Sequence, residues 1–237
     1  MYILSIDTGT KNLIVSIGSA DKYIDGIFIN SGRTHSKHII SEIDKLLEQA
    51  NLTLADIDYF AASEGPGSFT GLRIGISTVQ GFAFANNKPC LKVNTLDAFA
   101  RDNLSKNTLT LALMDARNRR VYAAAYFAND ILVPASVGDV EDFIKQVKLA
   151  LEESQYQVEK IIFAGDESRV IYSSDEDVLN LLPDSSIEVA EAYYKAEVLH
   201  RLAYEELEAG RTISAEELLP EYYSLTEAER NLETQNE

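Results

Sequence analysis

The chain has 237 residues and a formal net charge of −17 at neutral pH. This excess of carboxylates argues against a free-standing RNA-binding protein, because tight RNA binding depends on lysine and arginine neutralising phosphates. No stretch approaches the roughly 20 consecutive apolar residues that span a bilayer, so we expect no integral membrane protein.

The first half of the chain alternates strand-like and helix-like segments. Its opening is predicted to form an antiparallel meander of three strands, at residues 1–5, 13–17 and 23–29. Apolar residues at helical spacing then predict an amphipathic helix over residues 39–50. The remaining predicted elements are a strand at 59–62, a helix at 72–85, a strand at 91–93 and a helix at 96–104 with Thr95 as its N-cap.

The second half repeats the opening pattern. Predicted strands at 109–114 and 121–127 flank a turn, and an aspartate closes the first strand of each half, Asp7 and Asp115. A helix at 142–152, a strand at 160–164 and a long helix at 188–210 follow, before a polar, acidic tail that we expect to be loose. We therefore predict two α/β lobes, an N-terminal lobe of residues 1–107 and a C-terminal lobe of residues 108–237.

The turn Asp7-Thr8-Gly9-Thr10 lies between two predicted strands. It resembles the first phosphate loop of the actin, Hsp70 and hexokinase superfamily, in which backbone N–H groups cradle a nucleotide phosphate. The alternative is a plain hairpin turn. The corresponding turn of the second half, residues 115–118, contains no glycine. Its bulky side chains should obstruct phosphate, so we predict weak or no ATP binding by the isolated chain.

The most distinctive motif is the glycine-rich run of residues 65–75, GPGSFTGLRIG. It does not match the Walker pattern, because no lysine follows Gly71 and the spacing differs. Ser68 or Thr70 could satisfy the free N–H groups that open the following helix. Such a helix N-terminus can hold an anion, so Gly65, Gly67 and Ser68 are candidate phosphate contacts. A tight turn that packs strand against helix is the alternative interpretation.

The helix after this loop is notable for its lack of charge. Residues 74–87 include no charged side chain, in a chain where 25% of residues are charged. A helix that is apolar or small on all sides is buried on all sides. Either this helix is central to the core of the chain, or one side of it meets another subunit.

Several weaker signals favour structural interpretations. The lone cysteine, Cys90, excludes an internal disulfide and fits a reducing, cytoplasmic environment. His35 and His38 lack accompanying cysteine or carboxylate ligands, so we predict no metal site. Neither a hydrolase triad nor a nucleophile elbow is indicated. The basic turn of Arg117, Arg119 and Arg120 is predicted to be solvated surface, with a contact to RNA or to an acidic partner as the alternative. A second group of charges is also predicted to be solvated surface: Glu188, Glu191, Glu197, Glu205, Glu206 and Glu208.

The same motifs resemble the TsaB (YeaZ) family, whose members are related to the catalytic subunit TsaD. The resemblance runs nearly end to end, and the glycine loop with its FTGLR continuation is its most specific part. Its other parts are the opening Ile6-Asp7-Thr8, the His35-Ser36 pair, Asp115-Ala116-Arg117, Val121-Tyr122, and the closing run 219–222, LPEY.

This resemblance implies an actin-like (ASKHA, ribonuclease H-like) two-lobed α/β fold with mixed sheets and flanking helices. It implies a non-catalytic subunit of the machinery that makes threonylcarbamoyladenosine in tRNA. Family members pair with TsaD, are joined by the ATPase TsaE, form homodimers in the absence of TsaD, and leave tRNA mainly to those partners. The TsaD relatives hold a metal through His-x-x-x-His, whereas His35 and His38 are one residue too close.

In the family, the helices of the first lobe form the partner interface. A site for ATP or ADP at the subunit junction is a secondary hypothesis, and its candidate residues come from the Asp7 turn and the glycine loop: Asp7, Thr8, Gly9, Thr10, Gly65, Gly67 and Ser68. The candidate partner-binding residues are His38, Glu42, Leu46, Leu72, Arg73, Ile74, Gly75, Ile76, Val79, Phe82 and Ala83. The competing hypotheses are an actin-superfamily ATPase or small-molecule kinase that uses Asp7 and Thr8, and a metallopeptidase.

Overall fold

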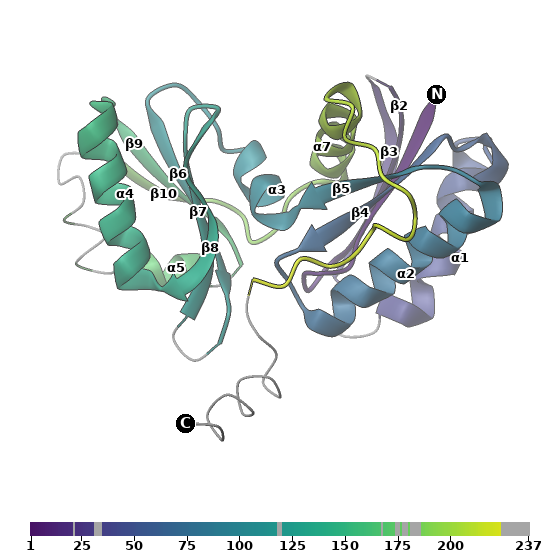
Figure 1. Ribbon diagram of the computed structural model, residues 1–237, viewed down its shortest axis with the longest axis horizontal. Coiled ribbons are helices and arrows are strands. Elements are labelled where there is room, and N and C mark those ends of the chain that lie inside the picture. Colours follow the sequence, from purple (N-terminus) through teal and green to yellow (C-terminus); the bar gives the residue numbers. More distant parts are fainter. Residues whose placement is uncertain are drawn as a thin grey trace.

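The protein folds into two lobes, each built on a five-stranded mixed sheet (Figure 1). The computed structural model describes residues 1–237 except 21, 31–34, 118–119, 167, 174–175, 177–179, 181–185 and 224–237. The strand order is β3-β2-β1-β4-β5 in the first sheet and β10-β9-β6-β7-β8 in the second. This duplicated arrangement, with helices on the faces of both sheets, is the predicted actin-like two-lobed fold.

The first sheet begins with the predicted antiparallel meander. Strand β1 pairs antiparallel with β2 and parallel with β4, so it lies at the centre of the sheet. Five of its six residues are buried, because helices cover both faces. The strands are β1 (Tyr2–Asp7), β2 (Leu13–Ser19), β3 (Lys22–Ile29), β4 (Tyr59–Gly65) and β5 (Cys90–Asn94).

Helices α1 (His35–Gln49) and α2 (Phe69–Asn86) cover one face of this sheet. The short 3₁₀ helix η1 (Leu54–Asp56) lies between α1 and β4. Helices α3 (Thr95–Arg101) and α7 (Ala196–Glu208) cover the other face. Helix α2 begins three residues before the predicted start, because Ser68 is its N-cap and its Oγ accepts the Gly71 N–H at 3.2 Å. The predicted cap of α3 was wrong: Asn94, not Thr95, accepts the N–H groups of Leu96 and Asp97.

The second sheet repeats the topology of the first. Strands β6 and β7 are antiparallel, and β9 runs parallel to β6. The sequence did not predict β8, which contains Pro134. Since β8 is an edge strand, a residue without an N–H is tolerated there. The elements are β6 (Thr108–Asp115), β7 (Arg120–Phe127), β8 (Asp130–Asp139), α4 (Val140–Ser154), β9 (Lys160–Gly165), α5 (Ser168–Tyr172) and β10 (Ser186–Val189).

The predicted long helix at 188–210 is confirmed over residues 196–208, but its predicted start was wrong. Residues 186–189 form β10, which pairs parallel with β9, and Glu188 forms an ion pair with Lys160 across that pair. The chain then crosses back to the first lobe, and α7 begins only after its N-cap, Lys195. The acidic residues that suggested one continuous helix therefore lie on a strand, a connection and a helix.

The chain does not stay in the second lobe to its end. Helix α7 packs on the first sheet, and residues 211–223, which we call the C-terminal strap, run back along α2 (Figure 1). Gln80 Nε2 donates to the carbonyl oxygens of Ala215 and Leu218, both at 3.0 Å, and Ile213 pairs with Cys90. The range 108–237, predicted as one lobe, therefore supplies part of both. The predicted loose tail beyond residue 223 lies outside the described residues.

Helix α3 and two buried tyrosines join the lobes. Helix α3 packs against strands of both sheets within one continuous apolar cluster. Tyr126 on β7 donates its hydroxyl to Asp97 on α3, and Tyr194, in the connection before α7, donates to Asp7. Burial raises the pKa of both phenols, so both remain protonated donors. The lobes thus share a hydrogen-bonded apolar junction.

A histidine is buried in the first lobe. His200 on α7 is 3% exposed and packs on Gly18, where an added Cβ would lie 2.3 Å from the imidazole Cε1. Burial lowers the pKa of His200 below its usual 6.5, while the Ser19 backbone and the Glu197 carboxylate act more weakly in the opposite direction. The Tyr23 ring also faces it, at a centroid distance of 6.4 Å. Folding therefore favours the neutral imidazole.

We expect the free energy of unfolding to fall as the pH is lowered below about 6.5. The unfolded chain binds a proton at His200 near this pH, whereas the folded chain does so only at lower pH. Urea unfolding at several pH values between 7.5 and 5 would measure the decline. His200→Gln should make it shallower; an unchanged pH slope would assign the dependence to other groups.

Candidate functional site at the first hairpin turn and helix α2

Asp7, at the end of β1, is fully buried where the lobes meet. Its Oδ1 accepts the Gly9 N–H at 2.6 Å, and its Oδ2 accepts the hydroxyl of Tyr194. The Asp7 carboxylate contributes to the raised pKa of Tyr194, second to burial. Sequence reasoning singled out Asp7 but missed Tyr194, which is 187 residues away and lies in a segment taken for helix. The carboxylate therefore has internal partners on both oxygens.

Thr8 and Gly9 dock directly on the glycine loop. The Thr8 hydroxyl donates to the Gly71 carbonyl at 2.7 Å, and the Ser68 N–H donates to the Gly9 carbonyl at 2.7 Å. A Cβ added to Gly67 would lie 2.6 Å from the carbonyl oxygen of Gly9. A Cβ added to Gly71 would lie 2.1 Å from the carbonyl oxygen of Thr8. The missing side chains of these glycines are what lets the hairpin and α2 approach.

The other two nucleotide candidates lie at the edges of this contact. Thr10 is half-buried, and its hydroxyl bonds the backbone of Asn12 within the turn. Gly65 is buried with a φ of +128°, and an added Cβ would lie 3.0 Å from the Glu221 carbonyl oxygen. The structure therefore brings Asp7, Thr8, Gly9, Gly67 and Ser68 together, with their polar groups largely bonded to one another.

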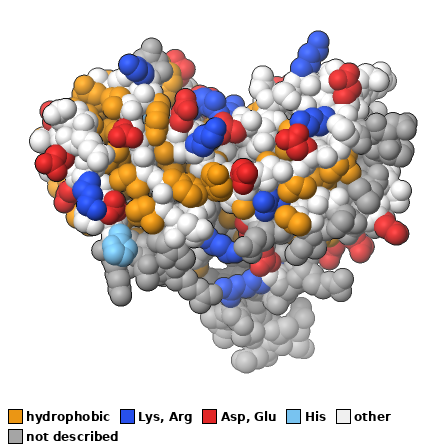
Figure 2. Space-filling view, turned by 180° about the vertical axis from the view of Figure 1, so that it is seen from behind, with side chains coloured by type: hydrophobic (Ala, Val, Ile, Leu, Met, Phe, Trp, Pro, Cys, Tyr) orange, Lys and Arg blue, Asp and Glu red, His pale blue; other side chains and the backbone are white. Residues whose placement is uncertain are grey.

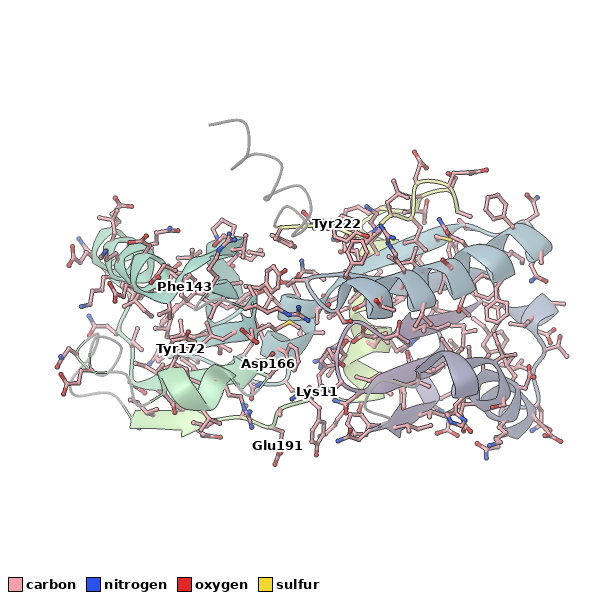
Figure 3. The ribbon with its side chains drawn as sticks, turned by 90° about the horizontal axis from the view of Figure 1, so that it is seen from below. Lys11, Phe143, Asp166, Tyr172, Glu191 and Tyr222 are labelled. Atoms are coloured by element: carbon pink, nitrogen blue, oxygen red, sulfur yellow. The ribbon has the colours of Figure 1, made fainter. Side chains whose placement is uncertain are left out.

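The corresponding turn of the second lobe is closed by its own hydrogen bonds. The Asp115 N–H donates to Asp166 Oδ2 at 3.0 Å, and the Arg117 N–H donates to Asp115 Oδ1 at 2.8 Å. Figure 3 places Asp166 and the first-lobe residue Lys11 at the junction of the lobes. Two carboxylates next to occupied N–H groups disfavour a phosphate here. Arg117 is exposed, Arg120 is half-buried, and Arg119 lies outside the described residues.

Helix α2 divides into a buried face and an exposed face. The prediction of partner contacts is corrected for five residues of α2, because they are buried within the chain: Leu72, Gly75, Ile76, Val79 and Ala83. Arg73 is exposed, and Ile74 and Phe82 are half-buried. The exposed face also carries Ser77, Gly81 and Phe84, of which Phe84 is 57% exposed. The core alternative therefore holds for the buried face of α2, and a subunit contact stays a prediction for the exposed face.

Helix α1 lies beside α2 on the same face of the sheet. His38 is exposed, and Glu42 is half-buried and paired with Lys45 at 2.7 Å. Leu46 is fully buried, so it belongs to the core rather than to a partner contact. The side chain of His35 lies outside the described residues.

Sequence reasoning missed a cluster at the N-terminal end of α2, formed by Phe69, Arg73 and Tyr222. The Arg73 guanidinium lies 3.8 Å from the Phe69 ring centroid, and its Nε donates to the Tyr222 hydroxyl at 3.0 Å. The two rings are stacked at 5.1 Å. Figure 3 shows Tyr222 at this end of α2. The closing LPEY run was noted in the sequence, but nothing in its pattern indicated this contact.

The remaining signals concern metals, charge and membranes. The described residues contain no cluster of three or more histidine, cysteine, aspartate or glutamate side chains suited to a metal. Burial raises the pKa of Cys90 to about 11, as expected for a small core residue. On the face in Figure 2, acidic and basic side chains are interspersed. No helix among the described residues is long and apolar enough to cross a membrane.

Comparison with known proteins identifies related sequences and structures. Residues 29–232 match the family model described as TsaD, tRNA N6-adenosine threonylcarbamoyltransferase. The tRNA threonylcarbamoyladenosine biosynthesis protein TsaB of Escherichia coli K12 is 38% identical over 128 residues, 53% of this chain and 55% of that protein. TsaB of Bacillus subtilis 168 is 27% identical over 181 residues, 76% of this chain and 77% of that one.

The chain thus spans about half the length of the Escherichia coli relative. A solved structure from Pseudomonas aeruginosa, described as similar to peptidase YeaZ, superimposes with a TM-score of 0.76 at 25% identity, covering 94% of this chain and 99% of that one. On the family match, the curated relatives and this shared fold, the chain belongs to the TsaB (YeaZ) family of tRNA threonylcarbamoyladenosine biosynthesis, within the wider group described by the TsaD family model.

Proposed function

We propose that this chain is a non-catalytic subunit that supports TsaD. In this role it assists transfer of the threonylcarbamoyl group from threonylcarbamoyl-AMP to the adenosine next to the anticodon, together with TsaE. The main support for this proposal is that curated relatives in this family are TsaB proteins of this pathway. We place the reaction in the cytoplasm, where tRNA is modified.

The geometry of the two hairpin turns supports a non-catalytic role. A working phosphate site needs free N–H groups that point at the ligand. In the first turn, the Gly9 N–H is bonded to Asp7, and Tyr194 covers the other carboxylate oxygen. In the second turn, Asp166 occupies the Asp115 N–H. No observation among the described residues favours the ATPase, kinase or metallopeptidase alternatives over this role.

We also propose that the isolated chain binds ATP weakly or not at all, and that ATP or ADP binds only at a junction with the partner. The buried Asp7 turn leaves little of the first phosphate loop accessible. A junction site would draw on donors from the partner as well as on this chain. The net charge of −17 supports a division of labour in which the partners hold most of the tRNA.

The exposed faces of α1 and α2 are the proposed partner surface, for TsaD and, in its absence, for a second copy of this chain. Helix α2 carries one charged residue, Arg73, along its 18 residues. Depletion of charge with retained aromatic and arginine residues is typical of the core of an interface. The buried residues Gly75 and Ala83 instead support this surface from beneath.

The test is threonylcarbamoyladenosine formation on tRNA, reconstituted from the other subunits of the same organism with and without this chain. We expect product only when the chain is present, and none from the chain alone, because it supports a catalytic subunit without replacing it. Mass spectrometry of nuclease-digested tRNA would measure the modified nucleoside.

Equal product with and without the chain would contradict the proposed function. Product from the chain alone would contradict its non-catalytic character. A matched reaction with heat-denatured chain controls for carried-over small molecules.

A further inference from the structure

Among the described residues, Arg73 is held in place by aromatic side chains and not by an acid. Phe69 lies under its guanidinium, and the Tyr222 hydroxyl accepts from its Nε, so two sides of the group are fixed. Both rings remain partly exposed, Phe69 at 41% and Tyr222 at 43%. Among the described residues, neither Nη group of Arg73 donates a hydrogen bond, so both are available for an outside acceptor.

The absence of an acidic partner is informative because the chain has 38 carboxylate residues and 21 lysine or arginine residues. Three of the other described arginines form ion pairs: Arg101 with Glu205, Arg201 with Asp102 and Arg211 with Glu206. Arg169 instead donates to two backbone carbonyls, and Arg117 and Arg120 form no ion pair with a described residue. Among the described residues, no carboxylate forms an ion pair with Arg73. A preorganised arginine without an anion, in an acidic chain, is suited to an anion supplied from outside.

The surroundings of Arg73 indicate what brings that anion. Phe69, Arg73, Ile74 and Ser77 line a shallow depression of about 430 Å³ that continues along the uncharged face of α2. If a protein covers this face, water leaves the guanidinium, and an arginine buried without a counter-charge is costly. A side-chain carboxylate matches the two Nη groups in a bidentate pair.

We propose that Arg73, positioned by Phe69 and Tyr222, binds an aspartate or glutamate side chain of the partner subunit at the N-terminal end of the α2 contact. This inference rests on the proposed pairing with TsaD. A protein carboxylate is favoured over an RNA phosphate because the flanking surface is uncharged and the chain as a whole repels polyanions. Arginine and aromatic side chains are also the usual anchors of protein interfaces.

The C-terminal strap supplies Tyr222, the second aromatic residue that contacts Arg73. The Glu221 N–H donates to the Glu64 carbonyl at 2.8 Å, and Asn94 Nδ2 donates to the Tyr223 hydroxyl at 2.9 Å. These bonds flank Tyr222 and fix it at the N-terminal end of α2. Tyr222 is therefore a positioning residue for Arg73, and the partner surface combines segments 149 residues apart.

The test compares the affinity of the full chain and its variants for the purified TsaD subunit of the same organism, by calorimetry. We expect Arg73→Gln to raise Kd by at least about 30-fold, as for an interface hot spot. The matched control is Arg201→Gln, which removes one exposed positive charge from α7, on the opposite face of the sheet. It should leave Kd unchanged. Tyr222→Phe should have an intermediate effect, because the ring remains while the hydroxyl is lost.

A charge swap identifies the partner group. Arg73→Glu should abolish binding, and one member of a set of TsaD variants with single surface carboxylates changed to arginine should restore it. If wild-type chain binds TsaD and Arg73→Gln binds equally well at unchanged melting temperature, this inference fails while the proposed function stands. If wild-type chain does not bind TsaD, both fail. Loss of tRNA affinity by the assembled complex with unchanged subunit Kd would overturn the carboxylate in favour of a phosphate.

Discussion

Gly71→Ala is expected to destabilise the first lobe by about 2–4 kcal/mol, at the upper end of what overpacking costs. The new methyl group would lie 2.1 Å from the Thr8 carbonyl oxygen, and that oxygen belongs to the backbone of a hairpin fixed on both sides. Relief would require α2 to move away from the hairpin, breaking the 2.7 Å bond from the Thr8 hydroxyl to the Gly71 carbonyl. Urea unfolding followed by circular dichroism would measure the change.

The matched control lies in the same helix. An added Cβ at Gly81 meets nothing within 4 Å, and this residue is exposed. Gly81→Ala should therefore be neutral or stabilise the chain by up to about 1 kcal/mol, because alanine has the higher helix propensity. Equal destabilisation by both substitutions would contradict the contact with the Thr8 turn as the cause of the Gly71→Ala effect.

Tyr194→Phe is expected to lower the free energy of unfolding by about 2 kcal/mol, since it removes a hydrogen bond to a buried carboxylate and leaves that acceptor short of a donor. Asp7 has no access to solvent that could replace the lost hydroxyl. The control is Tyr193→Phe, because Tyr193 is 42% exposed and its ring contact with Phe28 would remain. Thermal and urea unfolding would measure both variants.

A double-mutant cycle separates the hydrogen bond from general packing. Asp7→Asn removes the charge of the acceptor, so Tyr194→Phe should cost less in that background than in the wild type. Additive effects of the two substitutions would contradict a direct contribution from the Tyr194–Asp7 bond.

The helices and strands that were predicted well from the sequence have residue patterns that can be recognised within the element itself. Period-2 runs of β-branched and aromatic residues marked the central strands, and the apolar stripe of α1 marked its core face. The failures have a different origin. The acidic run from Glu188 to Glu208 suits a helix locally, but β9 offered backbone partners to residues 186–189. Asn94 is the cap in place of Thr95 because helix α3 already begins at Thr95, directly after β5.

The candidate site was only partly predictable, for physical reasons. An uncharged helix has no polarity contrast to say which side is buried, so α2 could not be oriented from its residues. The small Gly71 and Gly75 turned out to face the core and the large Phe84 the solvent. Tyr194 and Tyr222 contact residues more than 140 positions away, and such pairings leave no trace in local periodicity.

The return of α7 and the C-terminal strap to the first lobe determines when each lobe can form during synthesis. Residues 108–189 contain all strands of the second sheet, so that lobe is continuous and can fold once they have left the ribosome. The first 107 residues cannot fully cover both faces of their own sheet, because α7 supplies, beside α3, part of one of the two apolar layers. The lobe that begins the polypeptide is therefore completed last, and a nascent chain presents a finished α2 surface to its partner only after residue 222 has emerged.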